Sequence, residues 1–360
     1  MGAKDAKLSR LIPKFHFCSV PLFREAPLIN WTYTDAVLFT AYDVFRSHDF
    51  WLDEVVSSGA TLKKALVDLG FPKNNSLVID TGVFEMEAKK AGISQEIGID
   101  VDIELTNAQI FEAYELSGAD FFVAPDEIVL PTDKPNIIDE KIDLIKSNLL
   151  ELLDIVPASQ VVAVIQGLEQ TLIESLLDFY RENGIRLFAA GGIIPLYKHD
   201  KEVFQKHLKY VRETTRDDWL HIFGLPRISL LSYYLHDLNV DSVDTSTITY
   251  LTKQRMYLRG LKPEPVRLAK FEECECPGCT ILKENKSSRS PEFFANLYIH
   301  NIVTAVKECF KNGALSSKPV ILNTEDDSIA RNPNSSVKPI EVADSGWMTA
   351  DEVLRARKRG

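Results

Sequence analysis

Short apolar runs alternate with amphipathic segments between residues 36 and 245. Each run is rich in aliphatic, aromatic or β-branched residues and ends in small or acidic ones. The seven runs are Ala36–Ala41, Leu77–Asp80, Ala119–Pro125, Val161–Gln166, Arg186–Gly191, His221–Gly224 and Ser242–Asp244. Because the runs are continuously apolar rather than alternating, they predict strands buried on both faces, as in a parallel sheet.

The segments between the runs carry helix signals. Thr106 is a suitable N-cap for a helix that continues through Leu116, and the helical spacing of Thr171–Glu182 ends at the stop signal Asn183–Gly184. Seven strand–helix units predict an α/β fold, a (β/α)8 TIM barrel, whose eighth strand the pattern leaves unassigned. A doubly wound open sheet is the main alternative, but the glycine-rich phosphate loops typical of that class do not occur in the sequence.

The composition changes after Tyr250. Residues 253–270 hold six basic side chains and one acidic one, and a cysteine cluster and the apolar run Phe293–Phe310 follow. Residues 323–345 read as a linker, and the capping box that begins at Thr349 predicts a short helix. We therefore expect a barrel with its N-terminal segment over 1–270, a metal-binding insertion and helix over 271–312, and a C-terminal linker and short helix over 313–360.

Composition and charge narrow the class of protein. The chain has 360 residues, of which 45% are apolar and 26% charged, as in ordinary globular proteins. No apolar run approaches the roughly 18 residues of a membrane span, and the first residues lack the apolar segment of a signal peptide, so we expect a cytoplasmic protein with no membrane partner. The net charge of −11 repels nucleic acid at long range, although one basic face can sit on an acidic body.

Three of the five cysteines lie close together: Cys274, Cys276 and Cys279. An odd, clustered set is not a secreted disulfide framework, and in a cytoplasmic chain it indicates metal ligation. Pro277 and Gly278 supply the tight turn that lets three thiolates converge, and His300 in the predicted helix completes a Cys3His set typical of structural Zn²⁺. Cys309 competes as the fourth ligand, and reduced cysteines without a metal are the alternative.

Polar residues and a Gly-Gly pair stand where the predicted strands end, which in a barrel is the edge that carries active sites. They are Asp80, Asp126, Glu127, Gln166, Gly191, Gly192 and Asp244. Carboxylates around one barrel mouth repel each other unless a substrate or cation engages them, so they shift each other's pKa values and can divide the roles of acid, base and nucleophile. A helix N-cap is the alternative for each single Asp, but the whole set favours a site.

The order of these motifs resembles the tRNA-guanine transglycosylase superfamily, zinc-bearing (β/α)8 barrels that exchange guanine in a nucleic acid for a 7-deazaguanine. The similarity runs from about Val78 to Glu308. The matching segments are Ile79–Glu85, Pro125–Glu127, Val164–Gly167, Ala190–Ile193, His221–Gly224, Val243–Asp244, Cys274–Cys279 and His300–Asn301. The zinc motif behind the barrel motifs is the specific part of this resemblance.

The resemblance implies catalytic and base-binding roles. Asp244 would attack ribose C1′ through an oxocarbenium-like transition state and form a covalent intermediate, as a retaining glycosidase does. Asp80 would be the general acid for the departing guanine and the general base for the incoming base. Asp126 would accept from the guanine N1–H and 2-amino groups, and Gln166 and the Gly192 N–H would hold O6.

The other residues implied at the base are Phe84, Glu85, Ile193 and Phe223. Phe84 and Phe223 would sandwich the ring, with plain packing at the barrel mouth as the alternative. A base in such a site must first be flipped out of its stack or unpaired. The basic stretch after the strands would carry the phosphates, through Lys253, Arg255 and Arg259, with a solvated helix face as the alternative.

The chain departs from the family pattern at several positions. Val83 and Glu85 stand where the family has Gly and Gln, and Glu85 adds an acid that would act as the proton donor or assist it. Ser246–Thr249 replaces the Leu-Pro-Thr-Arg of the tRNA-acting members, which fits a DNA-acting paralogue at least as well as a tRNA enzyme. Tyr197 or a neighbour stands where bacterial members of the family have an acid that selects an aminomethyl base, so we expect a cyano or unsubstituted 7-deazaguanine.

Two other classes of function stay open from the sequence. One is a non-catalytic subunit of such an enzyme, against which the presence of both Asp80 and Asp244 argues. The other is an unrelated barrel enzyme that acts on a small molecule and uses zinc to staple its C-terminal part. The sequence also leaves open whether the protein forms a homodimer or needs a partner subunit.

Overall fold

The computed structural model describes residues 17–19, 36–41, 44, 60–68, 71–83, 86, 105–284 and 290–310. Its strands are β1 (Phe17–Ser19), β2 (Ala36–Thr40), β3 (Ser76–Asp80), β4 (Phe121–Val123), β5 (Val161–Ile165), β6 (Leu187–Ala190), β7 (Trp219–Ile222) and β8 (Ser242–Thr245). These eight strands close into a barrel in chain order. The predicted (β/α)8 barrel is confirmed, and the doubly wound alternative is wrong because such a sheet has two open edges.

The strand that the sequence pattern left unassigned is β1. It closes the ring by pairing in parallel with β2 on one side and with β8 on the other, so that Cys18 lies opposite both Ala36 and Asp244. The strand is only three residues long. The equally short β4 lies within the longer, mostly apolar run Ala119–Pro125, whereas the polar residues Lys14 and His16 directly precede β1 in the sequence, so no such run marks it.

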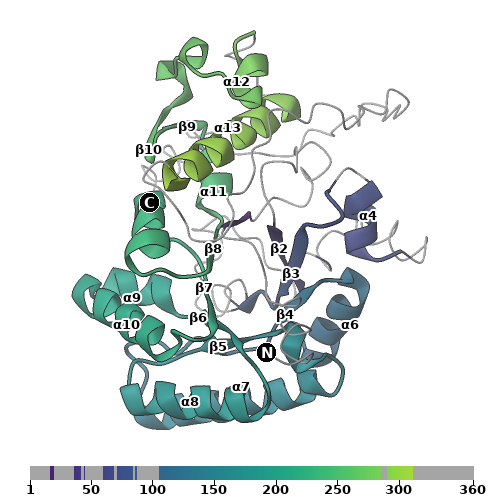
Figure 1. Cartoon of the computed structure of the whole chain (residues 1–360), viewed down its shortest axis with the longest axis vertical. Coiled ribbons are helices and arrows are strands. Elements are labelled where there is room, and N and C mark those ends of the chain that lie inside the picture. Colours follow the sequence, from purple (N-terminus) through teal and green to yellow (C-terminus); the bar gives the residue numbers. More distant parts are fainter. Residues whose placement is uncertain are drawn as a thin grey trace, which may run out of the picture.

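Helices surround the barrel (Figure 1). They are α4 (Leu62–Asp68), α6 (Asn107–Ser117), α7 (Pro135–Leu153), α8 (Gln170–Glu182), α9 (Ile193–His199) and α10 (Lys201–Thr214). Thr106 caps α6 in a reciprocal capping box with Gln109, and Asn183 ends α8, so both predicted boundaries are confirmed. Three short helical turns lie in the connections: η3 (Ala158–Gln160) precedes β5, and η4 (Ile228–Leu230) and the π-helical η5 (Tyr233–Asp237) lie between β7 and β8.

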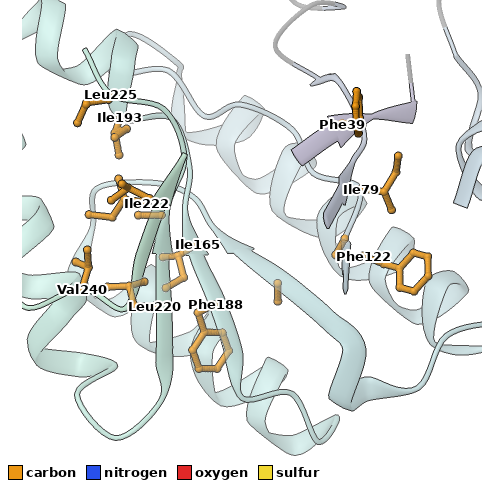
Figure 2. Close-up of a cluster of buried hydrophobic side chains, with 14 of the residues drawn as sticks. Phe39, Ile79, Phe122, Ile165, Phe188, Ile193, Leu220, Ile222, Leu225 and Val240 are labelled. Carbon is orange, nitrogen blue, oxygen red and sulfur yellow. The ribbon is translucent and has the colours of Figure 1, made fainter. Parts of the chain in front are cut away.

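Alternate residues of each strand face two different layers. On β7, Leu220 and Ile222 belong to the large hydrophobic cluster between strands and helices, whereas Trp219 belongs to a smaller cluster inside the barrel. Figure 2 shows the outer layer, with Ile79 and Ile165 on two further strands. Full burial of one such side chain contributes about 1.5–3 kcal/mol. The inner cluster fills the barrel with side chains, so chemistry is confined to its mouth.

The chain then forms a second unit, which we call the metal lobe (residues 256–310). It comprises β9 (Met256–Arg259), β10 (Lys262–Pro265), η6 (Val266–Leu268), η7 (Phe271–Glu273), α12 (Pro277–Leu282) and α13 (Pro291–Phe310), and α11 (Thr247–Lys253) connects it to β8. Figure 1 shows these elements gathered at one end of the molecule. The lobe has its own hydrophobic cluster around Phe271 and Leu297, while Tyr298 and Ile302 of α13 join the main core.

Two points complete the fold. Among the described residues, none of the helices combines the length and the apolar character needed to cross a lipid bilayer. The predicted linker and terminal helix over 313–360 lie outside the described residues.

Candidate functional site at the barrel mouth

The polar residues predicted at strand ends come together at one mouth of the barrel. Asp80 is the last residue of β3, Gln166 directly follows β5, and Asp244 lies near the end of β8. Asp126 follows β4, and Gly192 is the residue before α9, just after β6. Because parallel strands all end on the same side, this single mouth collects carboxylates from three separate parts of the chain.

Asp126 and Gln166 form a buried pair. The Gln166 Nε2 donates to Asp126 Oδ2 at 2.7 Å, and its Oε1 accepts from the Val129 N–H at 3.3 Å. Asp126 is 8% exposed and Gln166 1%. Burial, and next the negative charge of Asp80, raise the pKa of Asp126 to about 7, while the bond from Gln166 opposes this rise. The mouth therefore contains a carboxyl group that changes its charge near neutral pH.

Asp80 and Asp126 also act on a tyrosine behind them. Burial raises the pKa of Tyr114 well above its ordinary value, and the charges of Asp80 and then Asp126 raise it further. The hydroxyl thus stays protonated and donates to the Val123 carbonyl at 2.6 Å. This bond ties α6 to the strand that leads into Asp126.

The Gly191–Gly192 pair allows a close approach to Gln166. A Cβ at Gly191 would lie 2.3 Å from Gln166 Nε2, and one at Gly192 would lie 2.9 Å from Gln166 Oε1. Gly192 also has φ +64, a left-handed conformation that side chains disfavour. The side chain of Ile193 packs in the outer layer near Leu225 (Figure 2), so its contact with a base at the mouth would come from its backbone.

Asp244 is held by two donors on one oxygen. The Gly224 N–H donates to Asp244 Oδ1 at 2.8 Å, and His221 Nε2 lies 3.1 Å from the same atom. The other ring nitrogen of His221 lies 2.6 Å from Ser242 Oγ. Sequence reasoning singled out no role for His221. The alternation of the strand could have identified it: His221 is two residues from Trp219, so both side chains point into the barrel, and His221 is the polar one.

Of the predicted aromatic pair, the structure describes one member. Phe223 is partly buried, and the edge of its ring meets the ring of His221 with centroids 4.9 Å apart. It therefore lies beside the residue that contacts Asp244. Phe84 and Glu85 lie outside the described residues.

Four potential metal ligands converge in the metal lobe. The ligand atoms of Cys274, Cys276, Cys279 and His300 all lie within 4.8 Å of one another. The three sulfurs lie 3.6, 3.3 and 3.2 Å from His300 Nδ1. The predicted Cys3His set is thus assembled, and these distances suit four ligands around one small cation. The side chain of Cys309 lies outside the described ones.

The turn between these cysteines is as tight as its sequence predicts. Cys276 is the N-cap of α12, and its sulfur accepts from the Cys279 N–H at 3.3 Å. A Cβ at Gly278 would lie 2.2 Å from the Asn296 carbonyl oxygen, so only glycine lets α12 approach α13 this closely.

A second layer of contacts orients the histidine ligand. His300 Nε2 donates to the Leu258 carbonyl at 2.9 Å, which directs Nδ1 toward the cysteines, and the ring stacks on Tyr257 at 3.8 Å. The adjacent Asn301 accepts from the Leu258 N–H at 2.9 Å and donates to Thr252 Oγ1 at 3.2 Å. The bond to Thr252 fastens the metal lobe to α11, the helix that follows Asp244.

The predicted phosphate ligands have intramolecular partners. The Arg259 guanidinium is half exposed and pairs with Glu264 at 3.1 Å. The Arg255 guanidinium lies over the Phe293 ring, 4.6 Å from its centroid, and Lys253 stands in the last turn of α11. The charge of the basic stretch is therefore partly neutralised within the protein, which the count of basic residues does not reveal.

A family model matches the part of the chain that holds this site, whereas a comparison with individual curated proteins finds no match. The family model described as queuine tRNA-ribosyltransferase (TGT) matches residues 58–311, which include both the barrel mouth and the Cys3His cluster. Members of that family are pentosyltransferases that act on guanine-type bases in nucleic acid. The chain belongs to the queuine tRNA-ribosyltransferase family and is a glycosyltransferase.

Proposed function

We propose that the protein replaces guanine in a nucleic acid by a 7-deazaguanine through a covalent link between Asp244 and the ribose. The observation that carries this proposal is that one barrel mouth contains two carboxylates, Asp126 and Asp244, with different hydrogen-bond partners. Asp126 is bonded to Gln166, and Asp244 is fixed by two donors to one of its oxygens. The first arrangement suits recognition of a base, and the second suits a carboxylate that attacks in a fixed orientation.

The proposed exchange has two half-reactions. In the first, Oδ2 of Asp244 forms a bond to C1′, the electron pair of the C1′–N9 bond leaves with guanine, and Asp80 donates a proton to the departing base. In the second, Asp80 removes a proton from the incoming base, whose nitrogen attacks C1′, and the carboxylate of Asp244 leaves. The position of Asp80 supports this role, because its charge acts on Asp126 next to it.

Recognition of guanine would rest on Asp126. An ionised carboxylate accepts two bonds from the N1–H and 2-amino donors of the base, which compensates for the buried charge. The Gln166 amide nitrogen carries two hydrogens, so its bond to Asp126 is compatible with a second one to O6 of the base. The Gly192 N–H, and the ring of Phe223 together with Phe84 and Glu85, would complete the contacts.

We propose that the Cys3His cluster holds Zn²⁺. Three thiolates and one imidazole are the donor set of closed structural zinc sites, and four protein ligands leave no coordination position for a substrate. The ion would fold the metal lobe against α11 and neutralise thiolate charge. A reduced thiolate site is also in keeping with the cytoplasm.

The target nucleic acid and the incoming base are the finer part of the proposal. Ser246–Thr249 replaces the tRNA-contacting family segment, which supports a DNA target beside tRNA. Tyr197 packs edge-on against Phe204, with ring centroids 5.1 Å apart, and offers no carboxylate for an aminomethyl group. These features support a cyano or unsubstituted 7-deazaguanine as the incoming base.

The test is incorporation of labelled guanine or a labelled 7-deazaguanine into bulk tRNA and, separately, into duplex DNA. We expect wild-type protein to label either tRNA or DNA, and Asp244→Asn to label neither. Asp217→Asn, a change of the same kind at a side chain that is 87% exposed, is the matched control and should incorporate normally. Equal incorporation by Asp244→Asn and wild type would contradict the proposed nucleophile, and no label in either acid would contradict the proposed exchange.

A further inference from the structure

His221 is a buried histidine placed directly against Asp244. Its side chain is 4% exposed, and its Nε2 lies 3.1 Å from Asp244 Oδ1. The ring packs between two aromatic residues: it stacks on Trp219 of β7 with centroids 5.8 Å apart, and it makes a T-shaped contact with Phe223, which directly follows β7. These contacts and the burial hold the ring in one orientation, so its two nitrogens have fixed partners.

The partners of the two nitrogens determine where the proton sits. An ionised carboxylate offers only acceptor lone pairs, so the Nε2 that faces Asp244 must carry a hydrogen. Nδ1 lies 2.6 Å from Ser242 Oγ, and the Ser242 hydroxyl can donate to it. A neutral imidazole then satisfies both contacts, with Ser242 selecting the tautomer that donates to Asp244.

We propose that His221 is a positioning residue for the nucleophile, an inference that rests on the proposed function. His221 Nε2 and the Gly224 N–H converge on Oδ1 of Asp244. This convergence assigns bond formation with C1′ to Oδ2 and fixes the plane of the carboxylate. Ser242, on the same strand as Asp244, supports the histidine in turn.

The same contact serves both half-reactions. When Oδ2 bonds to C1′, the negative charge leaves the carboxylate and Oδ1 becomes the carbonyl oxygen of an ester. When the incoming base displaces the ester, the electron pair of the Oδ2–C1′ bond returns to Asp244. The two donors on Oδ1 then stabilise the carboxylate as a leaving group, without any proton being transferred to it.

The test separates this donor from simple packing. His221→Gln places an amide N–H2 near the position of Nε2, whereas His221→Asn is polar as well but reaches only toward Ser242. We expect His221→Asn and His221→Leu to lower kcat about 10- to 100-fold with KM for the labelled base within about threefold, because a hydrogen bond to a charged group is lost. His221→Gln should keep kcat within about fivefold of wild type.

Two controls make the outcome specific. His207→Leu removes another buried histidine, whose Nδ1 has no hydrogen-bond partner among the described residues, and should leave kcat unchanged. Thermal unfolding and zinc content report whether each variant is folded. Wild-type kcat in His221→Asn, or equal losses in folded His221→Gln and His221→Asn, would overturn the inference while Asp244→Asn remains inactive. Absence of exchange in the wild type would overturn the proposed function and this inference together.

Discussion

Two carboxylates at the barrel mouth are equally buried and differently held. Asp126 and Asp244 are both 8% exposed. Asp126 accepts from the Gln166 amide and from its own backbone N–H and faces the charge of Asp80. Asp244 instead has the Gly224 N–H and the His221 imidazole nitrogen on one oxygen. Burial therefore does not decide what a carboxylate does. Its partners decide, and they suit Asp126 to capture donors from a ligand and Asp244 to attack from a fixed position.

The largest effect is expected at Asp244. Asp244→Asn keeps the shape of the side chain and its contact with Gly224 but removes the nucleophile, so kcat should fall by roughly a thousandfold or more. Steady-state exchange of labelled guanine measures it, with circular dichroism as the check on folding. A loss below tenfold would show that Asp244 is not the attacking group, and the proposed difference in role between Asp244 and Asp126 would be wrong.

Asp126→Asn should separate stability from recognition. The folded-state pKa of Asp126, about 7, lies above its ordinary value of 3.8, so its contribution to folding is greatest below pH 4 and is lost as the pH rises through 7. Asn does not titrate in this range. The free energy of unfolding of the wild type, measured relative to Asp126→Asn, should therefore fall by roughly 2–3 kcal/mol between pH 5 and pH 8. Urea unfolding at the two pH values measures this difference, and a constant difference would contradict the account.

The proposed role of Asp126 predicts a pH dependence of guanine binding. The carboxylate that accepts from the base forms as the pH rises through about 7, so affinity for guanine should increase up to that pH and then level off. Titration calorimetry from pH 5.5 to pH 8.5 measures it. In Asp126→Asn the profile should be flat and the affinity low. A wild-type profile that is flat over this range would show that Asp126 does not read the base.

A smaller effect is expected when the partner of Asp126 is removed. Gln166→Leu deletes the bond to the carboxylate and leaves the buried Val129 N–H without its acceptor, which should cost about 1.5–3 kcal/mol of stability. The pH midpoint of guanine binding should also move upward, because the bond from Gln166 lowers the pKa of Asp126. Gln160→Leu, the same change in a short turn away from the mouth, should leave that midpoint unmoved; a shift in both variants would refute the role of the pair.

The smallest effect is expected in the metal lobe. Arg259 is half exposed and already paired with Glu264, and such surface pairs contribute about 0–1 kcal/mol. Arg259→Gln should therefore leave stability nearly unchanged, weaken nucleic-acid binding about two- to threefold, and lower the salt slope of binding by about one. Fluorescence anisotropy at several salt concentrations measures both. An unchanged slope would mean that Arg259 makes no phosphate contact.

Most of this fold can be predicted from the sequence because most of its strands lie in apolar runs separated by helical segments. Continuous apolar runs predict seven strands, but β1 (Phe17–Ser19) lies in no such run and is defined only by its pairing with β2 and β8. The Cys3His cluster is equally readable, since the spacing from Cys274 to Cys279 restricts the backbone locally. Features that depend on long-range pairing, such as the hydrogen bonds of Asn301 to Leu258 and Thr252, are not.

The site is readable in its residues but not in its connections. Asp126, Gln166 and Asp244 stand at predicted strand ends, yet the bond of Gln166 to Asp126 depends on how neighbouring strands are aligned and on the rotamers at the mouth. His221 lies in an apolar run where a histidine is most often a core residue. Only the register of β7 on β8, in which His221 lies opposite Ser242, brings its ring to the carboxylate.

The most direct measurement of the central claim is the identity of the residue that becomes attached to nucleic acid during the reaction. Wild-type protein is mixed with the nucleic acid that it labels, denatured rapidly, digested and analysed by mass spectrometry. The account predicts a ribose-linked peptide that contains Asp244, formed before exchange and absent from Asp244→Asn. Exchange that proceeds with no adduct, or an adduct on a peptide that contains Asp80 or Asp126 instead, would contradict it.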